Sequence, residues 1–148
     1  LISAPLEVYK VGTKEERREM VEEILQEVGL DKQYLNRFPH EFSGGQRQRI
    51  GIARALILNP EFVVCDEAVS ALDVSVRAQV LNLMRNMQQK KNLTYLFISH
   101  DLALVSSFCD RTYVLNHGRV VEVGETAQII HAPKEPYTKR LIESLLTV

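Results

Sequence analysis

The sequence predicts an α/β protein in which a helical segment, residues 1–60, precedes part of a parallel-sheet core, residues 61–148. The first segment carries helical patterns from residue 13 onward. After it, short and continuous apolar runs at 62–65 and 94–98 alternate with stretches of helical pattern. Strands of a parallel sheet are covered on both faces, so continuous apolar runs are typical of them, and alternation with helices favours this arrangement.

The first long helix is expected over residues 13–29. Thr13 and Glu16 have the spacing of a capping box, in which each side chain accepts a hydrogen bond from the other residue's backbone N–H. Gly29 is a typical residue for ending a helix. The apolar face of this helix consists of Met20, Val21, Ile24, Leu25 and Val28.

A short polar helix is expected over residues 31–37, and Phe38-Pro39 then breaks the chain. The next long helix begins at Ser43 and continues to Leu58, where Asn59-Pro60 ends it. Its buried stripe consists of Ile50, Ala53 and Ile57. The first sixty residues are therefore expected to form a helical unit.

The second segment begins with the two predicted strands, each followed by a helix. Asp73 and Asp101 can cap these helices, because an aspartate side chain accepts hydrogen bonds from the free N–H groups of a first helical turn. The apolar positions of the two helices are Val76, Val80, Leu83, Met84 and Met87 in the first, and Leu102 and Val105 in the second.

The last part of the chain carries a hairpin signal. Residues 111–115 and 119–123 are expected to be its strands, joined at Asn116-His117-Gly118. Two helical stretches follow, near residues 126–131 and 137–146.

Composition excludes several classes of partner. With 18 basic and 19 acidic residues the net charge is −1, so neither nucleic acid nor a membrane surface is expected to bind by electrostatics. No apolar run approaches the roughly 20 residues of a membrane span. Cys65 and Cys109 are too few for a disulfide framework or a zinc site, which fits a reducing, intracellular setting. The chain begins at Leu1, without methionine or a signal peptide, so we expect a fragment or a processed product.

Ser43-Gly44-Gly45-Gln46 opens a strongly helical segment. Such an arrangement directs bare N–H groups, a hydroxyl and the positive end of a helix at one place, which is how proteins hold phosphate without a dedicated cation. The alternative is an ordinary loop that ends in a helix cap.

Asp66 and Glu67 directly follow the first predicted strand, at the sheet edge where α/β proteins bind ligands. One carboxylate could hold Mg²⁺ that is bound to nucleotide phosphates, and the other could act as a general base on water. His100 follows the second strand and is expected at the same edge, where it could contact a γ-phosphate or the attacking water. The alternatives are solvated loop carboxylates and a histidine with a structural hydrogen bond.

Four segments, taken together and in this order, resemble motifs of ABC transporter ATPases. They are Phe42-Ser43-Gly44-Gly45-Gln46 for the signature motif, Phe62-Val63-Val64-Cys65-Asp66-Glu67 for the Walker B motif with its catalytic glutamate, Ser70-Ala71-Leu72-Asp73 for the D-loop, and Ile98-Ser99-His100-Asp101 for the switch-histidine loop. Three segments are similar to the oligopeptide and dipeptide importer branch, namely Asn36-Arg37-Phe38-Pro39-His40-Glu41-Phe42, Asp73-Val74-Ser75-Val76 and Glu135-Pro136-Tyr137-Thr138.

The resemblance implies a partial P-loop NTPase fold, ATP and Mg²⁺ as cofactors, and two kinds of partner at the cytoplasmic face of the membrane. A second ATPase subunit would form a head-to-tail dimer with this one. ATP hydrolysis by the dimer would be coupled to solute uptake through transmembrane permease subunits. Ser43, Gly44 and Gly45 would hold the γ-phosphate of an ATP on the partner subunit, with Gln46 as a polar contact at the rim. Asp73 would link the two sites across the dimer.

The same resemblance implies that Asp66 would hold Mg²⁺, that Glu67 would orient water and that His100 would sense the γ-phosphate. The chain departs from the family in having no G-x-x-x-x-G-K-[ST] segment and no Q-loop, and it has Ala68-Val69 where the family usually has Pro-Thr. We therefore expect the chain alone to bind ATP weakly and to turn none over. We also expect it to self-associate, because strands that lack their neighbours leave open edges.

Two other functions remain open from the sequence. A truncated subunit could be a non-catalytic interaction module that docks on an intact ATPase or on a membrane subunit. Retention of Glu67 and His100 favours the enzyme part, since a docking module needs neither. A DNA-repair or translation ATPase of the same superfamily is the third possibility, and the Glu135-Pro136-Tyr137-Thr138 segment and the near-neutral charge disfavour it.

Overall fold

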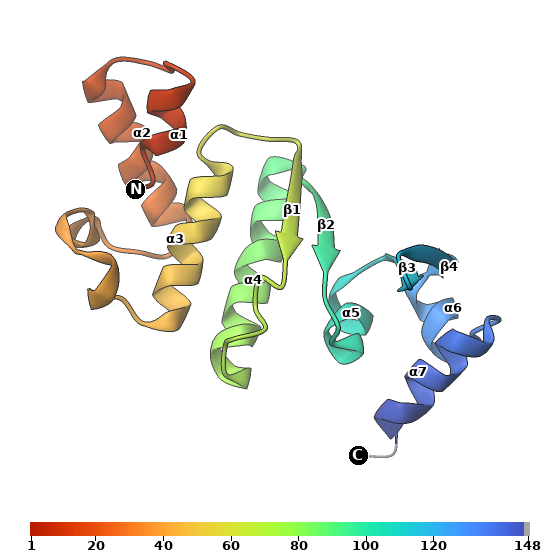
Figure 1. Cartoon of the computed structure of the whole chain (residues 1–148). Coiled ribbons are helices and arrows are strands. Elements are labelled where there is room, and N and C mark those ends of the chain that lie inside the picture. Colours follow the sequence, from red (N-terminus) through yellow and green to blue (C-terminus); the bar gives the residue numbers. More distant parts are fainter. Residues whose placement is uncertain (147–148) are drawn as a thin grey trace. The chain divides into compact units, whose positions relative to one another are not determined.

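The computed structural model describes residues 1–146, apart from the side chains of Asn36, Pro39, Leu145 and Leu146 (Figure 1). The chain divides into two compact units, Leu1–Ile98 and Ser99–Val148, and each is described by itself. The boundary after residue 60 that the sequence suggests stays a prediction. Both units mix helices and strands, so the predicted α/β class is confirmed.

The first unit holds four α-helices and two short 3₁₀ helices among its described residues. They are α1 (Ala4–Val8), α2 (Lys14–Glu27), η1 (Lys32–Asn36), η2 (Pro39–Glu41), α3 (Gly44–Leu56) and α4 (Val74–Lys91). The predicted capping box of α2 is present, since Glu16 N donates to Thr13 Oγ1 at 3.2 Å and Thr13 N donates to Glu16 Oε2 at 2.6 Å. Helix α1 was not expected from the pattern, and Pro5 in its first turn preorganises it.

The core of the first unit lies among the helices. Helix α2 contacts α3, and α3 contacts α4. The Arg49 guanidinium ties α3 to the end of α2 by donating to Val28 O at 2.8 Å. Fully buried side chains of this core include Leu6, Leu25, Val28, Leu56, Val80 and Met84. The apolar stripes that the helical spacing predicted therefore face one another.

The sheet of the first unit consists of β1 (Phe62–Asp66) and β2 (Thr94–Ile98), which pair in parallel, and α4 is the crossover between them. One face of the sheet lies against α4, where the Tyr95 hydroxyl donates to Met84 O at 3.3 Å. The opposite face is exposed, with Val64 at 55% and Leu96 at 44% accessibility. The expectation of strands covered on both faces therefore holds for one face only.

The second unit contains α5 (Leu102–Phe108), the strands β3 (Arg111–Asn116) and β4 (Arg119–Glu125), and then α6 (Thr126–His131) and α7 (Pro136–Leu146). The strands form the predicted antiparallel hairpin. His117 and Gly118 both have positive φ, +47° and +74°, as a tight two-residue hairpin turn requires. Inside the unit, the Thr112 and Thr126 hydroxyls share a buried hydrogen bond of 2.8 Å.

A carboxylate from the hairpin caps the final helix. Glu122 of β4 accepts hydrogen bonds from the N–H groups of Lys134, at 2.8 Å, and Glu135, at 3.2 Å, just before α7 begins. The Thr138 hydroxyl and these N–H groups hold the pKa of Glu122 below its usual range. The Glu135-Pro136-Tyr137-Thr138 segment is thus a helix start that a carboxylate of the neighbouring strand holds through the two preceding N–H groups.

Candidate functional site

The signature segment folds as a helix N-terminus that is capped from both directions. Ser43 has extended backbone, its Oγ accepts from Gln46 N at 3.3 Å, and its own N–H donates to Gln46 Oε1 at 2.9 Å. Ser43 and Gly44 are exposed. The segment is therefore a helix cap, as one alternative held, and it also presents the N–H groups of a first turn to solvent.

The structure brings the signature and the D-loop together. A Cβ atom placed on Gly45 would lie 2.5 Å from Val76 Cγ1, and one on Gly44 would lie 3.5 Å from Leu72 Cδ2. Real Cβ atoms do not approach a carbon at 2.5 Å, so only glycine at position 45 lets the start of α3 contact the start of α4 this closely. Two motifs separated by more than twenty residues thus form one surface.

Asp73 at the end of the D-loop is the N-cap of α4. Its Oδ1 accepts from Val76 N at 3.0 Å and from the Ser75 hydroxyl at 2.8 Å. The Val76 N–H, which has the larger effect, and the Ser75 hydroxyl hold the pKa of Asp73 below its usual range. The cap fixes the α4 terminus against which Gly45 packs.

Asp66 and Glu67 stand at the carboxyl end of β1. Asp66 is exposed and pairs in register with Ile98 of β2. Glu67 has a φ of +48°, in the left-handed region that non-glycine residues rarely adopt. Its N–H donates to Ile98 O at 3.0 Å, and its carbonyl accepts from the N–H and the hydroxyl of Ser70. A strained backbone held by several hydrogen bonds is typical of functional positions.

His100 lies in the second unit, between β2 and α5, and its side chain is exposed. The next residue, Asp101, caps α5 by accepting from Leu104 N at 3.1 Å, and Asp101 N donates to Ser99 Oγ at 3.0 Å. The loop that carries His100 is therefore well defined at its helical end. That His100 shares an edge with the β1 carboxylates stays a prediction.

Comparison with known proteins finds a family and several relatives that this chain resembles. A family model described as "ABC transporter" matches residues 4–70. The "Oligopeptide transport ATP-binding protein OppF" of Streptococcus pyogenes serotype M1 is 58% identical over 133 residues, which cover 90% of this chain and 43% of that protein. OppF of Bacillus subtilis (strain 168) is 51% identical over 146 residues, 98% of this chain and 48% of the relative. The "Dipeptide transport ATP-binding protein DppF" of Lactococcus lactis subsp. cremoris (strain MG1363) is 58% identical over 135 residues, with shares of 91% and 43%.

Residues 4–70 thus match the ABC transporter family model, and the chain is similar to ATP-binding proteins of peptide transport. The predicted resemblance to the oligopeptide and dipeptide branch is confirmed, and so is the partial P-loop NTPase fold with a helical part followed by parallel-sheet strands. The chain spans less than half the length of these relatives.

The donor set of the Walker B strand suits one particular kind of metal binding. Among residues 1–146 no group of three or more histidine, cysteine, aspartate or glutamate side chains could hold a metal ion. Asp66 and Glu67 are adjacent and both exposed, so this strand end offers one or two carboxylates. Mg²⁺ in nucleotide sites takes one or two carboxylates, with phosphates and water as its remaining ligands. The residues therefore fit a Mg²⁺ ion that arrives with a nucleotide.

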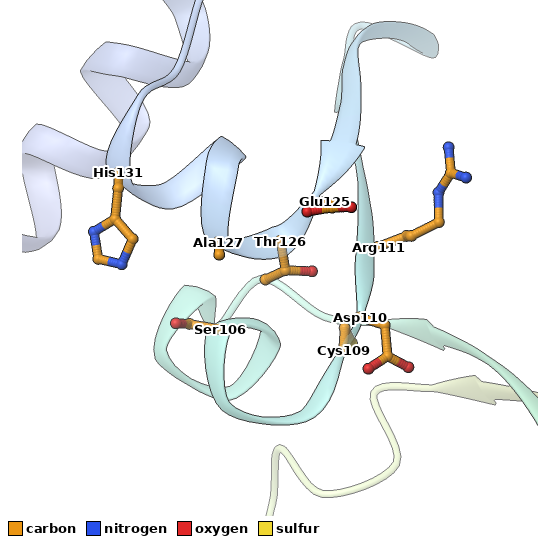
Figure 2. A pocket seen from close by; sticks show the side chains of 8 residues that line it. All are labelled: Ser106, Cys109, Asp110, Arg111, Glu125, Thr126, Ala127 and His131. Carbon is orange, nitrogen blue, oxygen red and sulfur yellow. The ribbon is translucent and has the colours of Figure 1, made fainter.

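A shallow pocket in the second unit contains none of the predicted site residues (Figure 2). Its lining comes from α5, the loop that follows it, both hairpin strands and α6. The lining residues are Ser106, Cys109, Asp110, Arg111, Glu125, Thr126, Ala127 and His131. Burial, and then the charge of Asp110, raise the pKa of the Cys109 thiol. A raised pKa disfavours the thiolate, so the Cys109 thiol is not an activated nucleophile.

None of the helices in the described part of the chain is both long and apolar enough to cross a membrane.

Proposed function

We propose that this chain contributes the signature and the D-loop of a shared ATP site in the ATP-binding subunit of an oligopeptide or dipeptide importer. The observation that carries the proposal is the close packing of Gly44 and Gly45 on Leu72 and Val76, which unites the two motifs on one exposed surface. The relatives are oligopeptide and dipeptide transport proteins by name, which supports the substrate class.

In this proposal the signature holds a nucleotide bound on a partner subunit. Ser43 and the N–H groups of Gly44 and Gly45 contact its γ-phosphate, because a helix N-terminus with free donors favours an anion. Asp73 links this site with the second site of the dimer. The partners are a second ATPase subunit, arranged head to tail, and permease subunits at the cytoplasmic face of the membrane.

The β1 carboxylates serve the other half of such a site. Asp66 holds Mg²⁺, Glu67 orients the attacking water, and His100 contacts the γ-phosphate. When bound there, a Mg²⁺ ion would supply positive charge that stabilises the phosphates. The residue that places Glu67 is Ile98, whose carbonyl receives the Glu67 N–H. Because the 148 residues contain no phosphate-binding G-x-x-x-x-G-K-[ST] loop, we propose that the chain alone turns over no ATP.

The test is Mg·ATP-dependent association with an intact subunit. This chain is mixed with Bacillus subtilis OppF that carries glutamine in place of its own catalytic glutamate, and binding is measured by sedimentation with and without Mg·ATP. We expect binding only with the nucleotide. Gly44→Asp should abolish it, because a carboxylate would then face the phosphate at a position where the added Cβ has ordinary contacts.

Gly51→Asp is the matched control, since it adds the same charge to the same helix in open space. It should bind as the unmodified chain does. Association without nucleotide, or association that Gly44→Asp and Gly51→Asp leave equally intact, would contradict the proposal and favour a non-catalytic docking module.

A further inference from the structure

Tyr34 of η1 lies beside the signature and is held from two sides. The Arg37 guanidinium lies 4.5 Å from the centroid of the Tyr34 ring. The ring of Phe42, the first residue of the signature segment, lies 5.7 Å away between ring centroids, in a tilted arrangement. Asp31 caps η1 by accepting from Gln33 N at 2.9 Å. The loop between α2 and α3 thus fixes the place of one aromatic ring.

The Tyr34 hydroxyl accepts a hydrogen bond from Gln46 Nε2 at 3.2 Å. The other end of the same carboxamide, Oε1, accepts from Ser43 N at 2.9 Å. Both ends of the Gln46 side chain are thereby engaged within the loop. A carboxamide that could otherwise rotate is held in one orientation, and that orientation sets the N–H group of Ser43.

We propose that Tyr34 is a positioning residue for the signature. Its hydroxyl orients Gln46, Gln46 fixes the backbone of Ser43, and the Ser43 hydroxyl and the following N–H groups are then preorganised for phosphate. Gln46 consequently serves the loop and leaves the phosphate contacts to Ser43 and the glycines. The functional part of this inference rests on the function proposed above.

The experiment compares Tyr34→Phe with Tyr95→Phe in the whole chain. Both changes remove one hydroxyl from a partly buried tyrosine of the first unit, and the Tyr95 hydroxyl bonds Met84 O far from the signature. The first measurement is amide hydrogen exchange by NMR at Ser43 and Gln46. We expect Tyr34→Phe to accelerate exchange of the Ser43 amide about three- to tenfold, as loss of a supporting hydrogen bond allows. Tyr95→Phe should leave it unchanged.

The second measurement is Mg·ATP-dependent association with the OppF variant. Tyr34→Phe should weaken it about three- to tenfold, with a melting temperature no lower than that of Tyr95→Phe. A merely structural role would move the melting temperature and leave the affinity unaltered. Unchanged Ser43 exchange in Tyr34→Phe overturns the inference, and so does faster exchange with unaltered affinity. An unmodified chain that never associates overturns the proposed function instead, and the exchange rates alone then decide whether Tyr34 holds this loop.

Discussion

The helices and the sheet of the first unit differ in how completely the chain covers them. Leu56 of α3 and Met84 of α4 are each 1% exposed, whereas Phe62 of β1 is 54% exposed and Ile98 of β2 is 46% exposed. The signature and the D-loop therefore rest on a closed helical core. The Walker B carboxylates rest on two strands with one open apolar face, so the two halves of the proposed chemistry differ in local support.

The largest expected effect is a difference in unfolding free energy between one leucine substitution in the helical core and one on the sheet. Leu56→Ala removes side-chain atoms from a site that is 1% exposed, while Leu96→Ala makes the same change on a residue that is 44% exposed. We expect Leu56→Ala to lower the free energy of unfolding by about 2–5 kcal/mol and Leu96→Ala to lower it by less than about 1 kcal/mol. Urea unfolding followed by circular dichroism measures both.

Equal losses for the two leucines would contradict the comparison, because they would mean that something covers the sheet face in solution. A second copy of the chain is the obvious candidate, since open strand edges and exposed apolar residues favour pairing. Light scattering over a range of concentrations distinguishes this case. The predicted self-association requires the apparent mass to rise with concentration, and Leu96→Lys to reverse the rise.

A smaller effect should appear where α3 meets α4. Gly45→Ala places a Cβ 2.5 Å from Val76 Cγ1, so the helices must separate. We expect a loss of about 1–3 kcal/mol in the free energy of unfolding. Gly51→Ala, on the exposed side of the same helix, should instead gain up to about 1 kcal/mol, because alanine favours helix and nothing lies within 4 Å of the added atom.

Truncating Val76 tests whether its side chain is the reason that Gly45→Ala destabilises the protein. In the Gly45→Ala, Val76→Ala double variant the loss should be smaller than the sum of the two single losses, because the methyl group that clashes is gone. If the losses simply add, glycine is required at position 45 for a reason other than its close approach to Val76.

Local rules in the sequence predicted much of this fold. The Thr13–Glu16 capping box, the Asp73 cap and the hairpin turn at His117-Gly118 all depend on residues within three positions of one another, and all three are confirmed. Helix α1 was missed because its five residues are too few to show a period.

The arrangement of the site was harder to predict, because it depends on contacts between distant segments. Gly45 meets Val76 across two helices, and Tyr34 reaches Gln46 from the preceding loop. The positive φ of Glu67 follows from a hydrogen bond to the end of the next strand. No pattern in a single stretch of sequence encodes these three features. One signal was available, namely that two adjacent glycines at a helix start suggest close packing.

The smallest effect concerns the pH dependence of the D-loop cap. The Val76 N–H and the Ser75 hydroxyl lower the pKa of Asp73, so the folded state holds its carboxylate ionised more strongly than the unfolded state does. The resulting stability is present above the ordinary aspartate pKa of about 3.9 and is lost as the pH falls through the lowered folded-state pKa.

Asp73→Ser keeps a capping oxygen without the titrating charge. Melting temperatures measured from neutral to acidic pH should therefore fall less steeply for Asp73→Ser than for the unmodified chain, and the difference should be confined to the acidic end. Parallel curves for the two proteins would show that the cap acts through hydrogen-bond geometry alone, and the charge of Asp73 would then be left for a role outside the helix terminus.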